Sequence, residues 1–158
     1  TTFKVYLPRV ESDADSPRPA TSTRRLQGNE TILLVEDQDR VRAIARAILE
    51  RSGYRVIVAP SPGDALMLCE QHQGKIDLLL TDVVMPWLSG TELAKRIAQM
   101  RPETKVLYTS GYTDDSVVRH GVLEGEMAFL QKPFTPESLS ARVREVLDGA
   151  RRVTLPQS

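Results

Sequence analysis

The hydrophobic positions of the chain become regular from residue 29 onward. Five short apolar runs, each of four or five residues, alternate there with longer segments whose apolar side chains recur at helical spacing. The short runs predict strands over residues 31–35, 55–59, 78–81, 105–109 and 128–131. The intervening segments predict helices over residues 41–49, 61–71, 91–100, 116–121 and 135–147. Strands that alternate with helices indicate an α/β fold, in which helices cover both faces of a parallel sheet.

The third apolar run is the most informative, because it is strongly hydrophobic and ends at an acid. Three leucines and Thr81 suit a strand that is buried on both faces of a parallel sheet. Asp82 follows directly, and Pro86 prevents regular structure from continuing. Ligands of open α/β sheets bind at the carboxyl ends of the strands, which is where Asp82 would lie. On this stretch alone, a loop or capping aspartate is an equally good interpretation.

The two ends of the chain lack this regularity. Residues 1–8, TTFKVYLP, alternate apolar and polar side chains and predict one further strand. Residues 9–28 are rich in Ser, Pro, Asp, Arg and Thr and have no hydrophobic period, which is typical of a linker. We therefore expect one domain over residues 29–149, followed by a tail at residues 150–158.

Composition narrows the class of protein. The 158 residues suffice for one domain with a proper core, and 21 basic residues balance 21 acidic ones, so no global field attracts nucleic acid or anionic membrane. The single cysteine, Cys69, excludes an intrachain disulfide and falls on the expected inner face of a helix. No apolar run approaches the length of a membrane span, and no signal-peptide pattern is present. These features predict a soluble cytoplasmic domain.

Polar side chains recur at the ends of the predicted strands. Glu36 and Asp37 follow the first strand, Asp82 the third, Ser110 the fourth and Lys132 the fifth. Such side chains converge at the carboxyl edge of a doubly wound sheet. Carboxylates held close together repel one another unless a cation joins them, and ligand sets made only of oxygen favour Mg²⁺. An aspartate at a metal can attack phosphorus and form an acyl phosphate, while an ammonium group and a hydroxyl stabilise the phosphoryl oxygens.

Four motifs at these positions resemble the receiver domain of two-component response regulators over residues 29–149. They are LLVEDQ for the acidic pair, TDVVMPWLSG around Asp82, YTSGY for the hydroxyl and FLQKPF for the lysine with its proline. The resemblance implies a flavodoxin-like, three-layer (βα)5 fold, a doubly wound parallel sheet with strand order 2-1-3-4-5. It also implies that Asp82 accepts a phosphoryl group from a phosphohistidine.

The same resemblance assigns the remaining site residues. Glu36, Asp37, Asp82 and the backbone carbonyl of Val84 would hold Mg²⁺, and Lys132 would support the phosphoryl group. Ser110 would follow the phosphate, and the aromatic ring of Phe129 would change rotamer on activation. Glu36 departs from the family pattern, because aspartate is commoner at its position. The Lys132–Pro133 peptide bond is expected to be cis, as it often is in the family.

The N-terminal segment TTFKVYLPRVE resembles the last strand of a histidine-kinase ATPase domain. Together with the linker, it suggests the C-terminal receiver of a hybrid sensor kinase whose parent chain can be anchored in a membrane. The partners would then be the histidine kinase core, as phosphohistidine donor, and a histidine phosphotransfer protein.

Alternative functions also fit parts of the sequence. A receiver-like module could dock partners without being phosphorylated, and a freestanding response regulator has the same motifs. Asp37-Gln38-Asp39-Arg40-Val41 matches the DxDxV pattern of haloacid-dehalogenase-type phosphatases, but that class leaves the Asp82 motif unexplained. Trp87, five residues after Asp82, fits either a partner contact or packing against a neighbouring loop.

Overall fold

The computed structural model describes residues 26–111 and 127–149. The strand expected at residues 1–8, most of the linker, the helix expected at residues 116–121 and the tail at residues 150–158 lie outside the described residues. None of the described helices is both long and apolar enough to cross a membrane.

Five parallel strands form one sheet in the order β2-β1-β3-β4-β5. Their bounds are β1 Thr31–Val35, β2 Arg55–Ala59, β3 Leu78–Asp82, β4 Lys105–Ser110 and β5 Ala128–Gln131. The predicted fold class and strand order are therefore confirmed. The order leaves β1 and β3 side by side although a helix, a strand and a second helix separate them in sequence, which brings Glu36 and Asp82 to the same edge.

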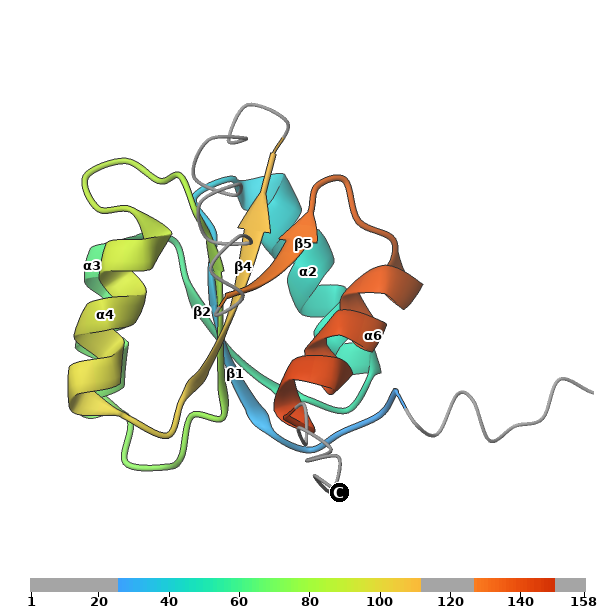
Figure 1. The fold of residues 1–158 in the computed structure, drawn as a ribbon, viewed down its shortest axis with the longest axis horizontal. Helices are drawn as coiled ribbons and strands as arrows, with labels where there is room; N and C mark the ends of the chain where they lie inside the picture. Colours follow the sequence, from blue (N-terminus) through green and yellow to red (C-terminus); the bar gives the residue numbers. More distant parts are fainter. Residues whose placement is uncertain (1–25, 112–126, 150–158) are drawn as a thin grey trace, which may run out of the picture.

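Four described helices cover the sheet in two layers. Helices α3 (Pro62–Gln71) and α4 (Gly90–Met100) lie on one face, and α2 (Asp39–Arg51) and α6 (Pro136–Leu147) lie on the other (Figure 1). Three of them begin at a hydroxyl residue whose side chain accepts a backbone N–H of the first turn: Ser61, Ser89 and Thr135. The helices agree with the predicted ranges to within one residue, apart from α2, which begins two residues before the predicted start and ends two residues after the predicted end.

Each face of the sheet has its own hydrophobic core, and β3 contributes to both. All five residues of β3 are buried, as a central parallel strand requires. Leu79 packs with residues of α3 and α4, including Cys69, whose side chain is buried as predicted. Leu78 and Leu80 pack on the other face, against residues such as Leu49 of α2 and Leu139 of α6.

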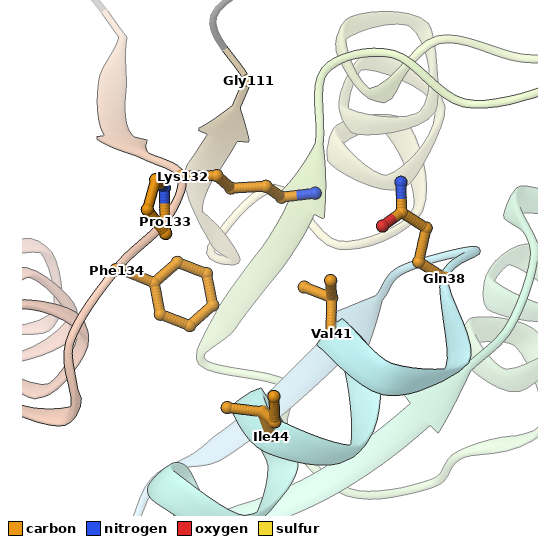
Figure 2. A pocket seen from close by; sticks show the side chains of 7 residues that line it. All are labelled: Gln38, Val41, Ile44, Gly111, Lys132, Pro133 and Phe134. Carbon is orange, nitrogen blue, oxygen red and sulfur yellow. The ribbon is translucent and has the colours of Figure 1, made fainter.

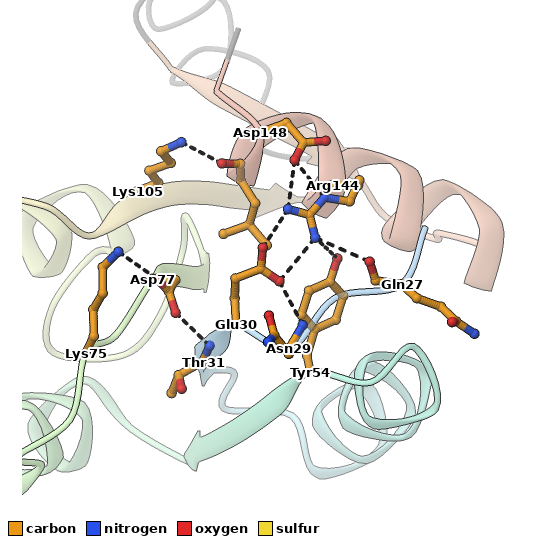
Figure 3. A network of polar contacts seen from close by, with 11 residues as sticks. Gln27, Asn29, Glu30, Thr31, Tyr54, Lys75, Asp77, Lys105, Arg144 and Asp148 are labelled. Atoms are coloured by element: carbon orange, nitrogen blue, oxygen red, sulfur yellow. Dashed lines mark hydrogen bonds and ion pairs between the residues drawn. The ribbon is translucent and has the colours of Figure 1, made fainter. Parts of the chain in front are cut away.

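At the amino edge of the sheet, Arg144 connects α6, near the end of the domain, to the residues that precede β1 (Figure 3). Its guanidinium group donates to both carboxylate oxygens of Glu30, at 2.6 and 3.1 Å, and to Asp148 at 2.8 Å. It also donates to the Tyr54 hydroxyl at 3.3 Å. Gly28 passes so close beneath this network that a Cβ there would lie 2.6 Å from a nitrogen of Arg144. The last residues before β1 are thereby packed onto the domain.

Candidate functional site

The predicted acidic residues meet at the carboxyl edge of the sheet. Glu36, Asp37 and Asp82 each offer a carboxylate oxygen, and these oxygens lie within 4.8 Å of one another. Glu36 and Asp82 are buried, with 3% and 7% of their surface exposed, whereas Asp37 is exposed. A set of three carboxylates around one small volume has the donor chemistry of a Mg²⁺ site, and these are the residues that could hold such an ion.

Lys132 joins the two buried acids. Its ammonium nitrogen lies 2.8 Å from Oε2 of Glu36 and 2.7 Å from Oδ2 of Asp82, and only 17% of its side chain is exposed. Burial favours the neutral amine, but the hydrogen bonds to both carboxylates outweigh it and raise the pKa of Lys132. Burial also raises the pKa of Glu36, with the contact to Lys132 opposing that shift. The lysine therefore stays charged and offsets the repulsion between the acids.

Hydrogen bonds from backbone amides fix the positions of these side chains. The amide of Gln38, the residue before α2, donates to Oε1 of Glu36 at 3.0 Å, and the amide of Val84 donates to Oδ1 of Asp82 at 3.4 Å. The amide of Lys132 donates to the carbonyl of Ser110 at 2.8 Å, so β4 and β5 end side by side. The Lys132–Pro133 peptide bond is cis, as predicted.

The two residues predicted to respond to phosphorylation lie on the neighbouring strands. Ser110 is the last residue of β4, is buried and meets Lys132 through its backbone. Phe129 of β5 is half-buried, and its ring lies 5.4 Å from that of Tyr108, with 32° between the ring planes. Its carbonyl accepts a hydrogen bond from Nε of Arg142 on α6 at 3.1 Å. The contacts of Phe129 thus connect it with β4 and α6.

An apolar pocket of about 370 Å³ opens beside Lys132 (Figure 2). Val41 and Ile44 of α2 form one wall, and Pro133 and Phe134 of the segment after β5 form the other. The side chain of Ile44 is 56% exposed at this pocket. The surface around the acids is therefore partly hydrophobic.

Trp87 is fully exposed and has a left-handed backbone conformation with φ of 74°. Packing against a neighbouring loop, one of the two interpretations from the sequence, is not seen among the described residues. Among residues 26–111 and 127–149, no side chain covers the ring.

Two residues that shape the site were not predicted from the sequence. Gly90 opens α4 directly beneath Asp82, where an added Cβ would lie 2.0 Å from the carbonyl oxygen of Asp82. Arg42 of α2 donates to the carbonyl oxygen of Glu36 at 2.9 Å. Gly90 stands in the TDVVMPWLSG motif, so its position close to Asp82 was a usable signal, whereas nothing in the sequence marked Arg42 among the surface charges of α2.

Comparison with known proteins agrees with this geometry. The family described as "Response regulator receiver domain" matches residues 32–144. The chain belongs to the response regulator receiver family. Among curated proteins it is 36% identical, over 94% of its length, to the sensor kinase CckA of Brucella abortus. It is 31% identical, over 91% of its length, to the sensor histidine kinase AruS of Pseudomonas aeruginosa. The chain spans only 16% and 14% of these two relatives.

Solved receiver structures share the fold. A receiver domain from the hybrid histidine kinase CckA is 33% identical, with a TM-score of 0.61 over 74% of this chain and 98% of that one. A CheY-like receiver from Methanospirillum hungatei is 30% identical, with a TM-score of 0.67 over 77% of this chain and 95% of that one.

Proposed function

We propose that this receiver domain accepts a phosphoryl group on Asp82 from a phosphohistidine and passes it on, or signals its presence, through protein partners. The observation that supports this most directly is the contact of Lys132 with both Asp82 and Glu36, beside the exposed acid Asp37. The arrangement concentrates one cation and three carboxylates around one reactive oxygen. A structural role alone does not require so much charge at the edge of a sheet.

The proposed chemistry is a displacement at phosphorus. A carboxylate oxygen of Asp82 forms a bond to phosphorus, the phosphorus–nitrogen bond of phosphohistidine breaks, and the departing imidazole takes a proton from solvent. Glu36, Asp37, Asp82 and the carbonyl of Val84 would hold a Mg²⁺ ion, whose positive charge would stabilise the phosphoryl oxygens. Lys132 binds one of those oxygens when the phosphoryl group arrives, exchanging part of its contact with Asp82 for that new one.

Signalling is proposed to start at Ser110 and Phe129. The Ser110 hydroxyl turns toward the phosphoryl group, and the ring of Phe129 changes rotamer as the end of β4 adjusts. Because Phe129 contacts Tyr108 and Arg142, this change alters the surface of β5 and α6. Phosphorylation then biases an equilibrium between two arrangements.

The similarity to sensor kinases supports a hybrid kinase as the parent protein. Its histidine kinase core would be the phosphohistidine donor and a histidine phosphotransfer protein the recipient, all in the cytoplasm. The apolar pocket beside Lys132 is a suitable surface for such a donor, because contact there excludes water next to the reacting groups. Membership of the receiver family favours this function over a haloacid-dehalogenase-type phosphatase.

The deciding experiment is intact-mass spectrometry after incubation with acetyl phosphate and Mg²⁺. We expect one phosphate adduct on the wild-type protein and none on Asp82→Asn or after chelation of the metal. Asp64→Asn is the matched control, because Asp64 is an acid of α3 that contacts Ser61, and this variant should keep the adduct. An unphosphorylated but folded wild-type protein, also unreactive toward a phosphorylated kinase core, would support the docking-module alternative instead.

A further inference from the structure

The side chain of Arg42 lies under the turn that presents Glu36 and Asp37. It donates to the carbonyl of Glu36 at 2.9 Å and to that of Asp37 at 3.5 Å, and it pairs with the carboxylate of Asp39. Only 18% of the arginine side chain is exposed, whereas Asp39 is 88% exposed. A planar guanidinium group can hold several oxygens at once in a fixed geometry, which an ammonium group cannot do.

The three carboxylates of the site depend on this turn to different degrees. Asp82 ends the buried strand β3, and Glu36 is held by Lys132 and by the amide of Gln38. Among the described residues, the side chain of Asp37 has no hydrogen-bond or ion-pair partner. The backbone alone therefore places its carboxylate, and Arg42 is the side chain that binds that backbone.

The same arginine also links the turn to α2. The amide of Arg42 donates to the carbonyl of Gln38, the first hydrogen bond of the helix, while its side chain reaches back to the two preceding carbonyls. The backbone amide and the side chain of Arg42 therefore both connect the turn to α2. A turn attached in this way has fewer conformations to lose when its carboxylates close around an ion.

We propose that Arg42 is a positioning residue for divalent-metal binding, acting through the backbone of Glu36 and Asp37. The inference rests on the proposed function, because it assumes that these acids hold Mg²⁺. It adds a residue outside the ligand set, which contacts the carbonyls of the turn and no carboxylate of the site. Groups that orient metal ligands from behind commonly change metal affinity by tenfold or more when removed.

The charge of Arg42 makes the proposal easy to test, because two effects have opposite signs. A positive charge close to a cation site weakens binding of that cation, so its removal should strengthen Mg²⁺ binding if charge alone matters. If Arg42 positions the turn, its removal should weaken Mg²⁺ binding despite the more negative site. The direction of the change therefore separates the two roles.

The experiment is calorimetric titration of Mg²⁺ into the wild-type protein, Arg42→Gln and Arg46→Gln. Arg46 is the matched control, since it lies one turn further along α2. It pairs with Glu50, at a distance of 2.8 Å, and not with the acids of the site. We expect binding about tenfold weaker for Arg42→Gln and little changed for Arg46→Gln. Equal or tighter binding by Arg42→Gln would overturn the proposal.

A second measurement needs no metal. Amide hydrogen exchange of residues 36–38 should be faster in metal-free Arg42→Gln than in the metal-free wild-type protein, whereas a purely electrostatic role leaves it unchanged. If Arg42→Gln does not fold, Arg42→Lys keeps the charge and should still bind Mg²⁺ more weakly, and unchanged affinity would refute the positioning role. A wild-type protein that binds no Mg²⁺ contradicts the proposed function itself, so the two failures are distinguishable.

Discussion

The ammonium nitrogen of Lys132 lies 2.7 Å from Oδ2 of Asp82, although the two residues are fifty positions apart in the chain. The same nitrogen contacts Glu36, so one cation serves two buried carboxylates. Without it, two negative charges would face each other in a poorly hydrated site, at a cost of several kcal/mol. The contact therefore contributes to folding as well as to the proposed chemistry.

Replacing Lys132 with methionine should destabilise the metal-free protein by about 3 kcal/mol, because Glu36 and Asp82 lose their shared cation. Mg²⁺ should restore part of that loss, since a ligand that binds only the folded state stabilises it. Urea unfolding with and without Mg²⁺ measures both effects. Arg96→Met, which removes an exposed cation 3.9 Å from Glu92 on α4, is the control and should change stability by less than about 0.5 kcal/mol. Equal stability of Lys132→Met and the wild-type protein would contradict the role of the lysine.

Gly90→Ala should displace the backbone at Asp82 and so disturb the site. The new Cβ would lie 2.0 Å from the backbone oxygen of Asp82 and 3.2 Å from Cγ2 of Thr81, so the backbone must shift. We expect a loss of about 2 kcal/mol in stability and slower phosphorylation by acetyl phosphate. Gly63→Ala is a matched control in the first turn of α3, where the nearest atom to a new Cβ is 3.8 Å away, and it should leave both properties almost unchanged. Wild-type behaviour of Gly90→Ala would show that the turn adapts freely.

The Glu30–Arg144 pair should produce a measurable dependence of stability on pH (Figure 3). The hydrogen bond from Arg144 lowers the pKa of Glu30 below its ordinary value of 4.5. A carboxyl group with a lowered folded-state pKa contributes stability above its unfolded value, and that contribution is lost as the pH falls through the folded-state pKa. At neutral pH, Glu30→Gln should cost about 1 kcal/mol, after allowance for solvent screening.

Urea unfolding at pH 7 and at about pH 3 tests this prediction, and the difference between the two proteins should shrink at the lower pH. Glu50→Gln, which affects the more exposed pair with Arg46, is the control and should change stability at pH 7 by less than about 0.5 kcal/mol. A difference for Glu30→Gln that is the same at both pH values would contradict the link to ionisation.

Ser110→Ala should separate phosphorylation from its structural consequence. In the wild-type protein, we expect beryllofluoride with Mg²⁺ to change amide exchange over residues 128–131. The variant should still accept a phosphoryl group on Asp82 but should lose this change. Thr109→Val is the control, because neighbouring residues of a strand point to opposite faces, and it should keep the response. An undiminished response in Ser110→Ala would exclude the hydroxyl as the coupling group.

The sequence predicted the elements of the described fold well, because buried parallel strands and amphipathic helices leave different hydrophobic periods. The run before Asp82 is buried throughout, as its three leucines indicated, and Cys69 is a core residue. The strand order came from the resemblance of four motifs to a known family, since hydrophobic periodicity does not say which strands are neighbours. The acids and the lysine were found because they follow strands, and parallel strands end at one edge.

Other contacts could not be predicted in this way. Arg42 and Arg144 look like ordinary surface charges in the sequence, and only the folded chain shows that one binds the Glu36 turn and the other binds Glu30. Exposure of Trp87 was likewise undecided, because a ring in a loop can turn inward or outward according to its backbone conformation.

The sequence by itself determined where the strands and helices lie and which residues follow each strand, because hydrophobic periodicity is a local property of a chain. Tertiary structure alone decided that Lys132 bridges Glu36 and Asp82, that Gly90 touches the backbone of Asp82 and that Arg42 supports the acidic turn. These contacts depend on distances of a few ångströms between segments far apart in sequence. Such distances are set by the packing of all the elements together.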